Sequence, residues 1–397
     1  MAARWKVRKL PLWHWVIAGV AGALIIAGFS TWALDSWEMI QQRITGGAME
    51  NEKLQAQVAS ISAELAKLKS EDQYKRNETL QKDIKAIETA YTQTVTTYEA
   101  LLDLKAVSKD TKKLDESFAN ILTLLSKRNY ASASAQLTLL RSTIKTEQDK
   151  IVSSFVIPAN IAQSNVPPGS GWSRQSVTAD IGTYLVDIIA ADMGSTRIIV
   201  DTASDGTCLR DCPVLPLGDY VSRNGAVAAI NGSYFCPADY PSCADKKNSF
   251  DTLLMNKNKV YFNSENNVYS TVPAVIFQSG SMRFVSRSLD WGRDTGVDGV
   301  LANQPLLLSG GTIVFGGSGD PKQGSKGNRS FVGNKGSTAY IGVVHNATVA
   351  EVAHVLKALG LDGALNLDSG GSTALWSGGH KVGPGRNIPN AILFVRK

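Results

Sequence analysis

The pattern of apolar and polar residues divides the chain into three unlike regions. The first is an apolar stretch from Leu12 to Leu34 that contains no Asp, Glu, Lys or Arg, and it is long enough to cross a bilayer as a helix. Residues 50–155 follow, with apolar residues at helical spacing and with neither proline nor glycine. Residues 172–397 are rich in glycine and in short apolar runs that are typical of strands.

The apolar stretch predicts one transmembrane helix, residues 12–34. Basic residues precede it, at positions 4, 6, 8 and 9, whereas the acidic Asp35 and Glu38 follow it. This charge asymmetry predicts a cytoplasmic basic tail, residues 1–11, and a single-pass protein of the cell membrane whose later residues are extracellular or periplasmic. The alternative is a cleaved signal peptide, for which the apolar stretch is long.

Residues 35–156 are predicted to form an all-α stalk that is partly a coiled coil. Apolar residues step by four and three, the a/d spacing of a coiled coil, at Leu54, Val58, Ile61, Leu65 and Leu68. The same steps recur between Leu80 and Leu101, and the polar stretch between the two series predicts a hinge or a skip in register. Two further helices are expected near residues 109–127 and 131–154. The stalk either pairs with further copies of the chain, as a homo-oligomer, or folds as a self-contained bundle.

A linker rich in proline, glycine and serine, residues 157–171, separates the stalk from the last region. Residues 172–397 are predicted to form an α+β domain of catalytic type, with a mixed sheet and few helices. Six apolar runs predict strands, beginning at Tyr184, Thr196, Ala226, Ala274, Thr338 and Asn390. One clear helix is expected at Thr348–Gly360, because a threonine caps its start, Glu351 lies three residues on and a glycine ends it.

Composition narrows the classes of function. Apolar residues make up 43% of the 397 residues, which is enough for a packed core in part of the chain. The net charge of +6 is small for this length and no basic run with interleaved aromatics occurs, so no nucleic-acid partner is expected. The histidines are scattered and predict no metal triad. We expect no required cofactor and leave open a Ca²⁺ ion on loop oxygens.

Four cysteines lie in two short stretches, CLRDC and CPADYPSC. Four cysteines allow three pairings, and we expect the local ones, Cys208–Cys212 and Cys236–Cys243, because each would fix an irregular loop. Crossed pairing, a zinc site and free thiols are the alternatives, although the spacings fit a zinc ribbon poorly.

Three turns that contain glycine carry the candidate chemistry: AINGSYF at 229–235, GNRSFVG at 327–333 and LNLDSGGSTALW at 365–376. In the third, an apolar strand ends at Asp368, and Gly370 and Gly371 allow a turn whose N–H groups face outward. Such a turn binds an anion or a sugar oxygen. The alternative is an ordinary tight turn in which Asp368 bonds to its own backbone.

Together with GRNIPNAILFV at 385–395, these stretches resemble the phosphodiester glycosidase family in their order and spacing. The resemblance covers about residues 172–397. It implies hydrolysis of sugar-1-phosphodiesters of the N-acetylglucosamine 1-phosphate type, in envelope or extracellular glycans, and many bacterial members are linked to exopolysaccharide. The chain departs from the usual motifs at Ser233, Tyr234, Ser330, Phe331 and Ser369, which changes the pocket wall and leaves the substrate open.

The resemblance and the chemistry of a sugar phosphodiester imply roles for particular residues. Asp368 would be the catalytic carboxylate, as nucleophile, as base or as the acceptor of a sugar hydroxyl, and Arg329 and Arg386 would bind the phosphate in a bidentate way. Asp201, Asp205 and Asp251 are weak candidates for a second carboxylate. Contacts with the substrate are expected from Asn231, Gly232, Tyr234, Ser369, Gly370, Gly371, Ser372, Thr373 and Asn390.

Three functions compete on the sequence alone. The favoured one is a membrane-anchored surface glycosidase whose partner is a glycan or sugar-phosphate substrate. The second is a carbohydrate-binding or cell-envelope scaffold protein that keeps the fold without turnover. The third is an assembly subunit that acts through oligomerisation of residues 50–155.

Overall fold

The computed structural model describes residues 12–265 and 270–397. The chain divides into two compact units, and the boundary in sequence lies between Ala86 and Ile87. The first unit contains helix α1, Leu12–Ser70, and the beginning of helix α2, Asp72–Lys105. The two helices are separated at Glu71. This break lies in the polar stretch where the sequence predicted a hinge or a skip.

The predicted transmembrane helix is wrong. Among the helices of residues 12–265 and 270–397, none combines the length and the apolar character that a membrane span requires. Residues 12–34 do not form a separate element, because they begin α1, a helix of 59 residues that continues through a strongly polar sequence to Ser70. The predicted single-pass localisation, with the C-terminal domain outside, rested on that span and is wrong with it.

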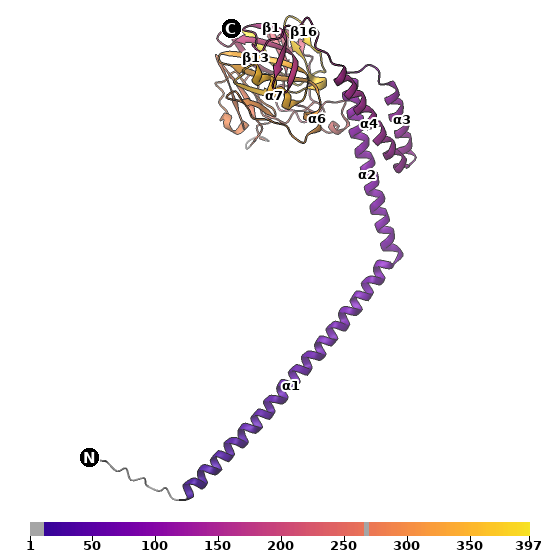
Figure 1. Cartoon of the computed structure of the whole chain (residues 1–397), viewed down its shortest axis with the longest axis vertical. Coiled ribbons are helices and arrows are strands. Elements are labelled where there is room, and N and C mark those ends of the chain that lie inside the picture. The colour runs from indigo at the N-terminus through magenta and orange to yellow at the C-terminus, as the bar shows by residue number, and fades with distance from the viewer. Residues whose placement is uncertain (1–11, 266–269) are drawn as a thin grey trace, which may run out of the picture. The chain divides into compact units, whose positions relative to one another are not determined.

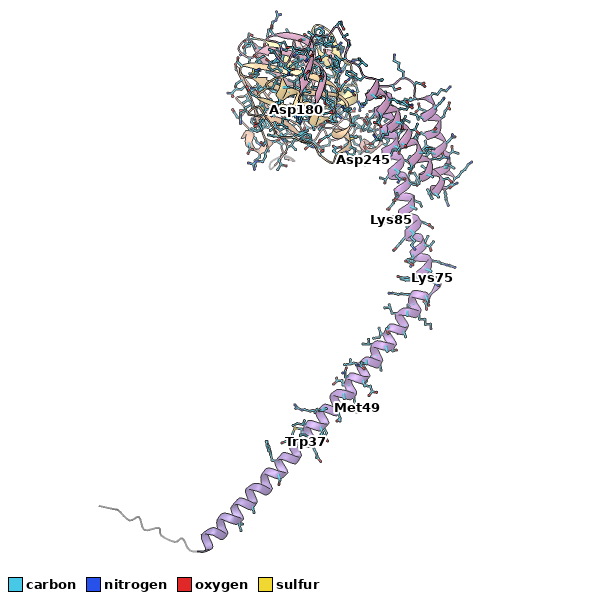
Figure 2. All side chains as sticks on the ribbon, viewed as in Figure 1. Trp37, Met49, Lys75, Lys85, Asp180 and Asp245 are labelled. Carbon is cyan, nitrogen blue, oxygen red and sulfur yellow. A yellow bond between two sulfur atoms is a disulfide. The ribbon has the colours of Figure 1, made fainter. Side chains whose placement is uncertain are left out.

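The stalk residues of α1 are largely exposed. Trp37 and Met49 project from the helix, with 63% and 71% of their surface exposed (Figure 2). The five a/d residues from Leu54 to Leu68 are between 51% and 65% exposed. Within the described part of the chain this seam is therefore uncovered, and a coiled coil with a second copy stays a prediction.

The second unit begins with a helical layer. The C-terminal part of α2 packs with α3, Lys112–Ser126, and α4, Tyr130–Ser154, which lie side by side (Figure 1). Both helices fall within a few residues of the ranges expected from the sequence. Their buried face is an apolar cluster, in which the rings of Tyr98 and Phe118 stack at 5.1 Å.

Three antiparallel sheets make up the rest of this unit. The seven-stranded sheet has the order β1 (Gly171–Ala179), β2 (Gly182–Asp192), β13 (Thr338–Ala347), β12 (Gly327–Lys335), β14 (Gly363–Asn366), β10 (Leu306–Ser309) and β11 (Thr312–Ile313). The second sheet has the order β16 (His380–Val382), β15 (Leu375–Trp376), β4 (Ala228–Asn231), β17 (Asn390–Arg396) and β3 (Thr196–Thr202). The third has the order β6 (Tyr261–Phe262), β5 (Leu254–Met255), β9 (Gly299–Ala302), β7 (Ala274–Gln278) and β8 (Ser281–Val285).

Short helices cover and connect the sheets. They are α5 (Leu217–Asn224), α6 (Pro321–Gly324), α7 (Val349–Ala358) and the 3₁₀ turns η1 (Pro241–Cys243), η2 (Ser288–Trp291) and η3 (Gly370–Ser372). Helix α7 begins with the capping box predicted from Thr348 and Glu351, and it covers one face of the seven-stranded sheet (Figure 1). The opposite face packs against the other two sheets around a large apolar core. The sheet-rich domain and the N-terminal helices of the predicted fold are thus present, without the membrane span. The predicted mixed sheet is wrong, because neighbouring strands in all three sheets are antiparallel.

Candidate active site

The ends of strands from two sheets meet at Asp368. This residue follows β14 of the seven-stranded sheet, and its N–H donates to the carbonyl of Gly232, which follows β4, at 3.0 Å. The amide of Asn231 in turn donates to the carbonyl of Asp368 at 2.6 Å. The main chain of Asp368 is therefore held between the two sheets, and its side chain is placed where the sheets meet.

The carboxylate of Asp368 lies partly buried above turn η3. One of its oxygens accepts the N–H of Ser369 at 2.9 Å. Burial raises the pKa of Asp368 to about 6, because a charge is less stable away from water. The hydroxyl of Ser372, the Ser369 N–H and the positive charges of Arg386 and Lys322 oppose this rise. Asp368 is thus a carboxyl group that titrates close to neutrality beside two cations.

Arg386 is the cation that lies along the glycine turn. Its guanidinium occupies the place that a Cβ atom on Gly371 would need, and its N–H of the main chain donates to the Gly371 carbonyl at 2.8 Å. The guanidinium also lies over the ring of Tyr240, with 5.2 Å from Cζ to the ring centroid, and Nη1 is 3.7 Å from Asp239. The side chain is 20% exposed, so the cation is both held and accessible.

This packing makes Gly371→Ala a specific test of Arg386. The new methyl group would displace the end of a flexible side chain, so we expect little change in the thermal midpoint of unfolding. Because the guanidinium must move, we expect roughly tenfold weaker binding of N-acetylglucosamine 1-phosphate, the type of ligand that the sequence motifs imply. Gly206→Ala is the matched control, since no atom lies within 4 Å of its added Cβ. Equal affinity of the two variants, measured by calorimetry, would exclude this role of Gly371.

Arg329 supports the segment that carries Lys322. Its Nε donates to the carbonyl of Ala347 at 3.1 Å, and Nη2 donates to the carbonyl of Lys322 at 2.7 Å and to that of Ser325. Burial lowers the pKa of Arg329. Nη1 makes no hydrogen bond within the described residues, so only this nitrogen remains for a ligand. The structure therefore places Arg329 mainly as the support of α6 and leaves its predicted contact with phosphate to Nη1.

Asn231 and Asn390 are buried and are bonded within the protein. The amide oxygen of Asn231 accepts the Ser330 hydroxyl at 2.9 Å and the Ala374 N–H at 3.1 Å. Asn390 bonds in both directions with Ser233, at 2.9 Å to its N–H and at 3.0 Å to its hydroxyl. Its oxygen also fills the space beside Gly232. Both asparagines thus hold the turns of the site together, and their predicted sugar contacts would need these bonds to open.

The hydroxyl groups of Ser369 and Thr373, on either side of η3, are likewise bonded within the protein, whereas the glycines between them face solvent. Ser369 accepts the Ser330 N–H at 3.3 Å, and Thr373 is buried and donates to the carbonyl of Asn328 at 3.3 Å. Gly370 is exposed, with φ of 62°, a backbone conformation that favours glycine. The surface of the turn that faces solvent is therefore the backbone at Gly370 and Gly371.

Tyr234 brings a hydroxyl group to the site. Its oxygen accepts the amide of Asn366 at 2.6 Å, and its N–H donates to Asn303 at 2.9 Å. Burial raises its pKa well above the usual value, and the negative charge of Asp368 adds to this effect. The hydroxyl stays protonated, and its proton has no acceptor among the described residues. Tyr234 can donate it to a bound ligand.

The three weak candidates for a second carboxylate are not among the groups that shift the pKa of Asp368. Asp201 is buried in an ion cluster with Arg223 at 2.7 Å and Lys257 at 3.3 Å, and Asp205 borders the cavity beside that cluster. Asp251 lies exposed in a loop. The described residues contain no group of three or more His, Cys, Asp or Glu side chains that would hold a metal ion.

The structure adds site residues that the sequence analysis missed. Lys322 and Tyr240 are the main ones, together with Asp239 beside Arg386 and Asp320, which caps α6 and acts electrostatically on Arg329. No motif marks them, because they come from loops distant in sequence. The local disulfide pairing is confirmed, Cys208–Cys212 and Cys236–Cys243, and the second bridge closes the loop that carries Tyr240.

Comparison with known proteins identifies one family over the part of the chain that contains the candidate site. A family model described as phosphodiester glycosidase matches residues 224–395, a range that includes Asn231, Arg329, Asp368 and Arg386. The resemblance found in the sequence motifs is confirmed over that range, which is less than half of the chain, and the match supports a function of the glycosidase type for this domain. No curated protein matches the chain.

Three solved structures are similar at low identity. A hypothetical protein from Synechocystis has 14% identity and a TM-score of 0.41 over 57% of this chain and 62% of its own. The catalytic domain of zebrafish N-acetylglucosamine-1-phosphodiester alpha-N-acetylglucosaminidase has 17% identity and a TM-score of 0.46, over 60% of this chain and 87% of its own. An exported protein from Burkholderia pseudomallei has 11% identity and a TM-score of 0.33, over 54% of this chain and 74% of its own. This chain thus spans less than two thirds of the Synechocystis structure.

Proposed function

We propose that this protein hydrolyses sugar-1-phosphodiesters, with a glycan or sugar phosphate of the N-acetylglucosamine 1-phosphate type as substrate. The observation that carries the proposal is one carboxyl group, Asp368, whose pKa of about 6 is lowered by two nearby cations, the partly exposed Arg386 and the exposed Lys322. Such a pair suits a substrate that presents a sugar carbon and a phosphate side by side. The family match over residues 224–395 supports the same reading.

The leaving group explains why cations matter more here than a second acid. Cleavage between C1 of the sugar and the bridging oxygen releases a phosphate monoester, whose second pKa is about 6. That group leaves as an anion without first being protonated, so it needs positive charge more than a proton donor. Arg386 and Lys322 supply that charge, Nη1 of Arg329 adds to it, and the Tyr234 hydroxyl donates a hydrogen bond to the substrate.

Asp368 acts on the sugar carbon in its ionised form. As the bond between C1 and the bridging oxygen breaks, that oxygen keeps the electron pair and positive charge develops at C1. The carboxylate either bonds to C1, in which case water then attacks C1 and breaks that bond, or it takes a proton from the water that attacks C1 directly. The water oxygen ends on C1, one of its protons remains in the new hydroxyl group and the other is released.

A pH profile tests the ionised form. Because the pKa of Asp368 is about 6, we expect kcat/KM to fall tenfold per pH unit below about pH 6. Ionisation of the substrate does not contribute to this fall in kcat/KM, because a phosphodiester keeps its single negative charge across that pH range. Lys322→Met removes a positive charge that lowers the pKa of Asp368, so the acidic limb of the pH profile should move to higher pH in this variant. Lys113 lies on an exposed face of α3, and Lys113→Met should leave the limb unchanged. Activity that rises as the pH falls to 5 would assign Asp368 to the protonated form.

The activity itself is tested with the full chain and the methylumbelliferyl ester of α-N-acetylglucosamine 1-phosphate. We expect release of free N-acetylglucosamine together with methylumbelliferyl phosphate. Saturable binding of the ester without any release would instead favour a carbohydrate-binding protein with the same fold. That outcome would contradict the proposed hydrolysis.

A further inference from the structure

The loop closed by Cys236–Cys243 lies between the candidate site and helix α2. On its inner side, the ring of Tyr240 carries two cations: Lys322 Nζ lies 4.8 Å and Arg386 Cζ lies 5.2 Å from the ring centroid. These are the same two cations whose charge lowers the pKa of Asp368. Tyr240 is only 8% exposed, so its ring is a fixed surface and not a mobile flap. An aromatic face attracts cations and limits where they settle.

The outer side of the same loop is bound by two carboxylates of α2. The hydroxyl of Tyr240 donates to Asp103, and the N–H of Ser242 donates to Glu99 at 3.0 Å. Glu99 and Asp103 are one helical turn apart and so lie on one face of the helix. Glu99 is 9% exposed, which is rare for an acidic residue without a specific partner. Both bonds are charge-assisted and hence strong.

In the hydrogen bond between Tyr240 and Asp103, the Tyr240 hydroxyl is the donor. Burial raises its pKa well above the usual value, and the charge of Asp103 raises it further. The hydroxyl therefore remains a donor, and its only acceptor among the described residues is Asp103. Fixing the hydroxyl fixes the plane of the ring on which Lys322 and Arg386 rest. The negative charge of Asp103 also acts on Arg329, the support of α6.

We propose that α2 is a working part of the substrate site: Glu99 and Asp103 are positioning residues that hold the Cys236–Cys243 loop, and the Tyr240 ring aims Lys322 and Arg386 at the phosphate of the substrate. Both carboxylates lie outside residues 224–395 but within the same compact unit as the sheets. The helical region is thus more than a spacer. This inference rests on the proposed function for the identity of the phosphate ester, but its contacts do not depend on turnover.

The test uses full-length variants and two readouts, the affinity for N-acetylglucosamine 1-phosphate by calorimetry and the KM and kcat for the methylumbelliferyl ester. Asp103→Ala should weaken binding and raise KM roughly tenfold, the effect of losing one hydrogen bond to a charged group, with kcat changed far less. Asp103→Asn keeps an acceptor for the Tyr240 hydroxyl and should restore most of the affinity. Tyr240→Phe keeps the ring and loses its fixation, so it should resemble Asp103→Ala. The double variant should be no worse than either single variant, because both remove the same bond. Glu116→Ala, on an exposed face of α3, is the control.

The outcomes separate this inference from the proposed hydrolysis. Weaker binding in Asp103→Ala, in a chain that releases no sugar, would support the positioning role and remove the hydrolase. Normal hydrolysis and normal affinity in folded Asp103→Ala and Tyr240→Phe would overturn the positioning role and leave the hydrolase. Additive losses in the double variant, or wild-type protein that binds no sugar phosphate, would also overturn it.

Discussion

Asp368→Asn is expected to lower kcat by on the order of 10³-fold or more, because it removes the carboxylate that we propose acts on the sugar carbon. Affinity for N-acetylglucosamine 1-phosphate should change little, since the cations that hold the phosphate remain. The carboxamide is nearly the same size, and one of its atoms still accepts the Ser369 N–H. Loss of turnover with retained binding would therefore report on chemistry and not on folding.

The same substitution should make the protein more stable at neutral pH. The pKa of Asp368 is about 6 in the folded chain, above the ordinary value of 3.8, so folding disfavours the ionised form. Each unit of that difference corresponds to about 1.4 kcal/mol, which gives a gain of the order of 1–3 kcal/mol for Asn above about pH 6. The gain should fade as the pH falls from 6 to 4 and should vanish below about pH 3, where the carboxyl is protonated in the folded and in the unfolded chain. Urea unfolding at pH 4 and 7.5 measures it, with the exposed Asp205→Asn as control. Equal stability of Asp368→Asn and wild type at pH 7.5 would contradict the raised pKa.

Asn231→Ala is the second large effect, and here stability falls. The side chain is fully buried and its three hydrogen bonds join both sheets through Asp368, Ser330 and Ala374. Removing it leaves the carbonyl of Asp368, the hydroxyl of Ser330 and the N–H of Ala374 without this partner, at a cost of about 1–3 kcal/mol for each group that stays unpaired. The main chain of Asp368 also loses one of its two bonds to the second sheet, so turnover should fall as well.

The check on Asn231 is urea unfolding of the full-length variant beside Asn258→Ala. Asn258 is exposed and, within residues 12–265 and 270–397, only its backbone N–H is hydrogen-bonded, so its substitution should be nearly neutral. If Asn231 were mainly a ligand for sugar hydroxyls, its loss would weaken substrate binding and leave stability unchanged. That result would contradict the structural role described above.

The sequence was informative where structure is local. Residues close together in the chain form the capping box of α7 and determine the pairing of cysteines within two short loops. They also form the short motifs at the ends of strands. The place of Asp368 at the end of an apolar strand follows from the same kind of pattern. The apolar stretch at residues 12–34 misled, because lack of charge identifies a candidate span but not where the helix containing it ends.

The rest of the site depends on contacts between distant segments. Asn231 and Asn390 follow the family pattern, but the packing of two sheets against each other uses their polar atoms within the protein. Lys322 and Tyr240 have no motif and meet Arg386 only in the folded chain. The carboxylates of α2 come from a helix that the sequence marked only as a stalk. Spacing along the chain carries no information about such meetings.

The most direct test of the central claim is the position of the bond that breaks. The full chain is incubated with the methylumbelliferyl ester of α-N-acetylglucosamine 1-phosphate in water enriched in ¹⁸O, and the products are weighed by mass spectrometry. A glycosidase in which Asp368 acts on C1 places the label in the hydroxyl of the released sugar and leaves methylumbelliferyl phosphate unlabelled. Label in the phosphate would mean that the phosphorus–oxygen bond is cleaved, and it would contradict the account of Asp368, Arg386 and Lys322 given above.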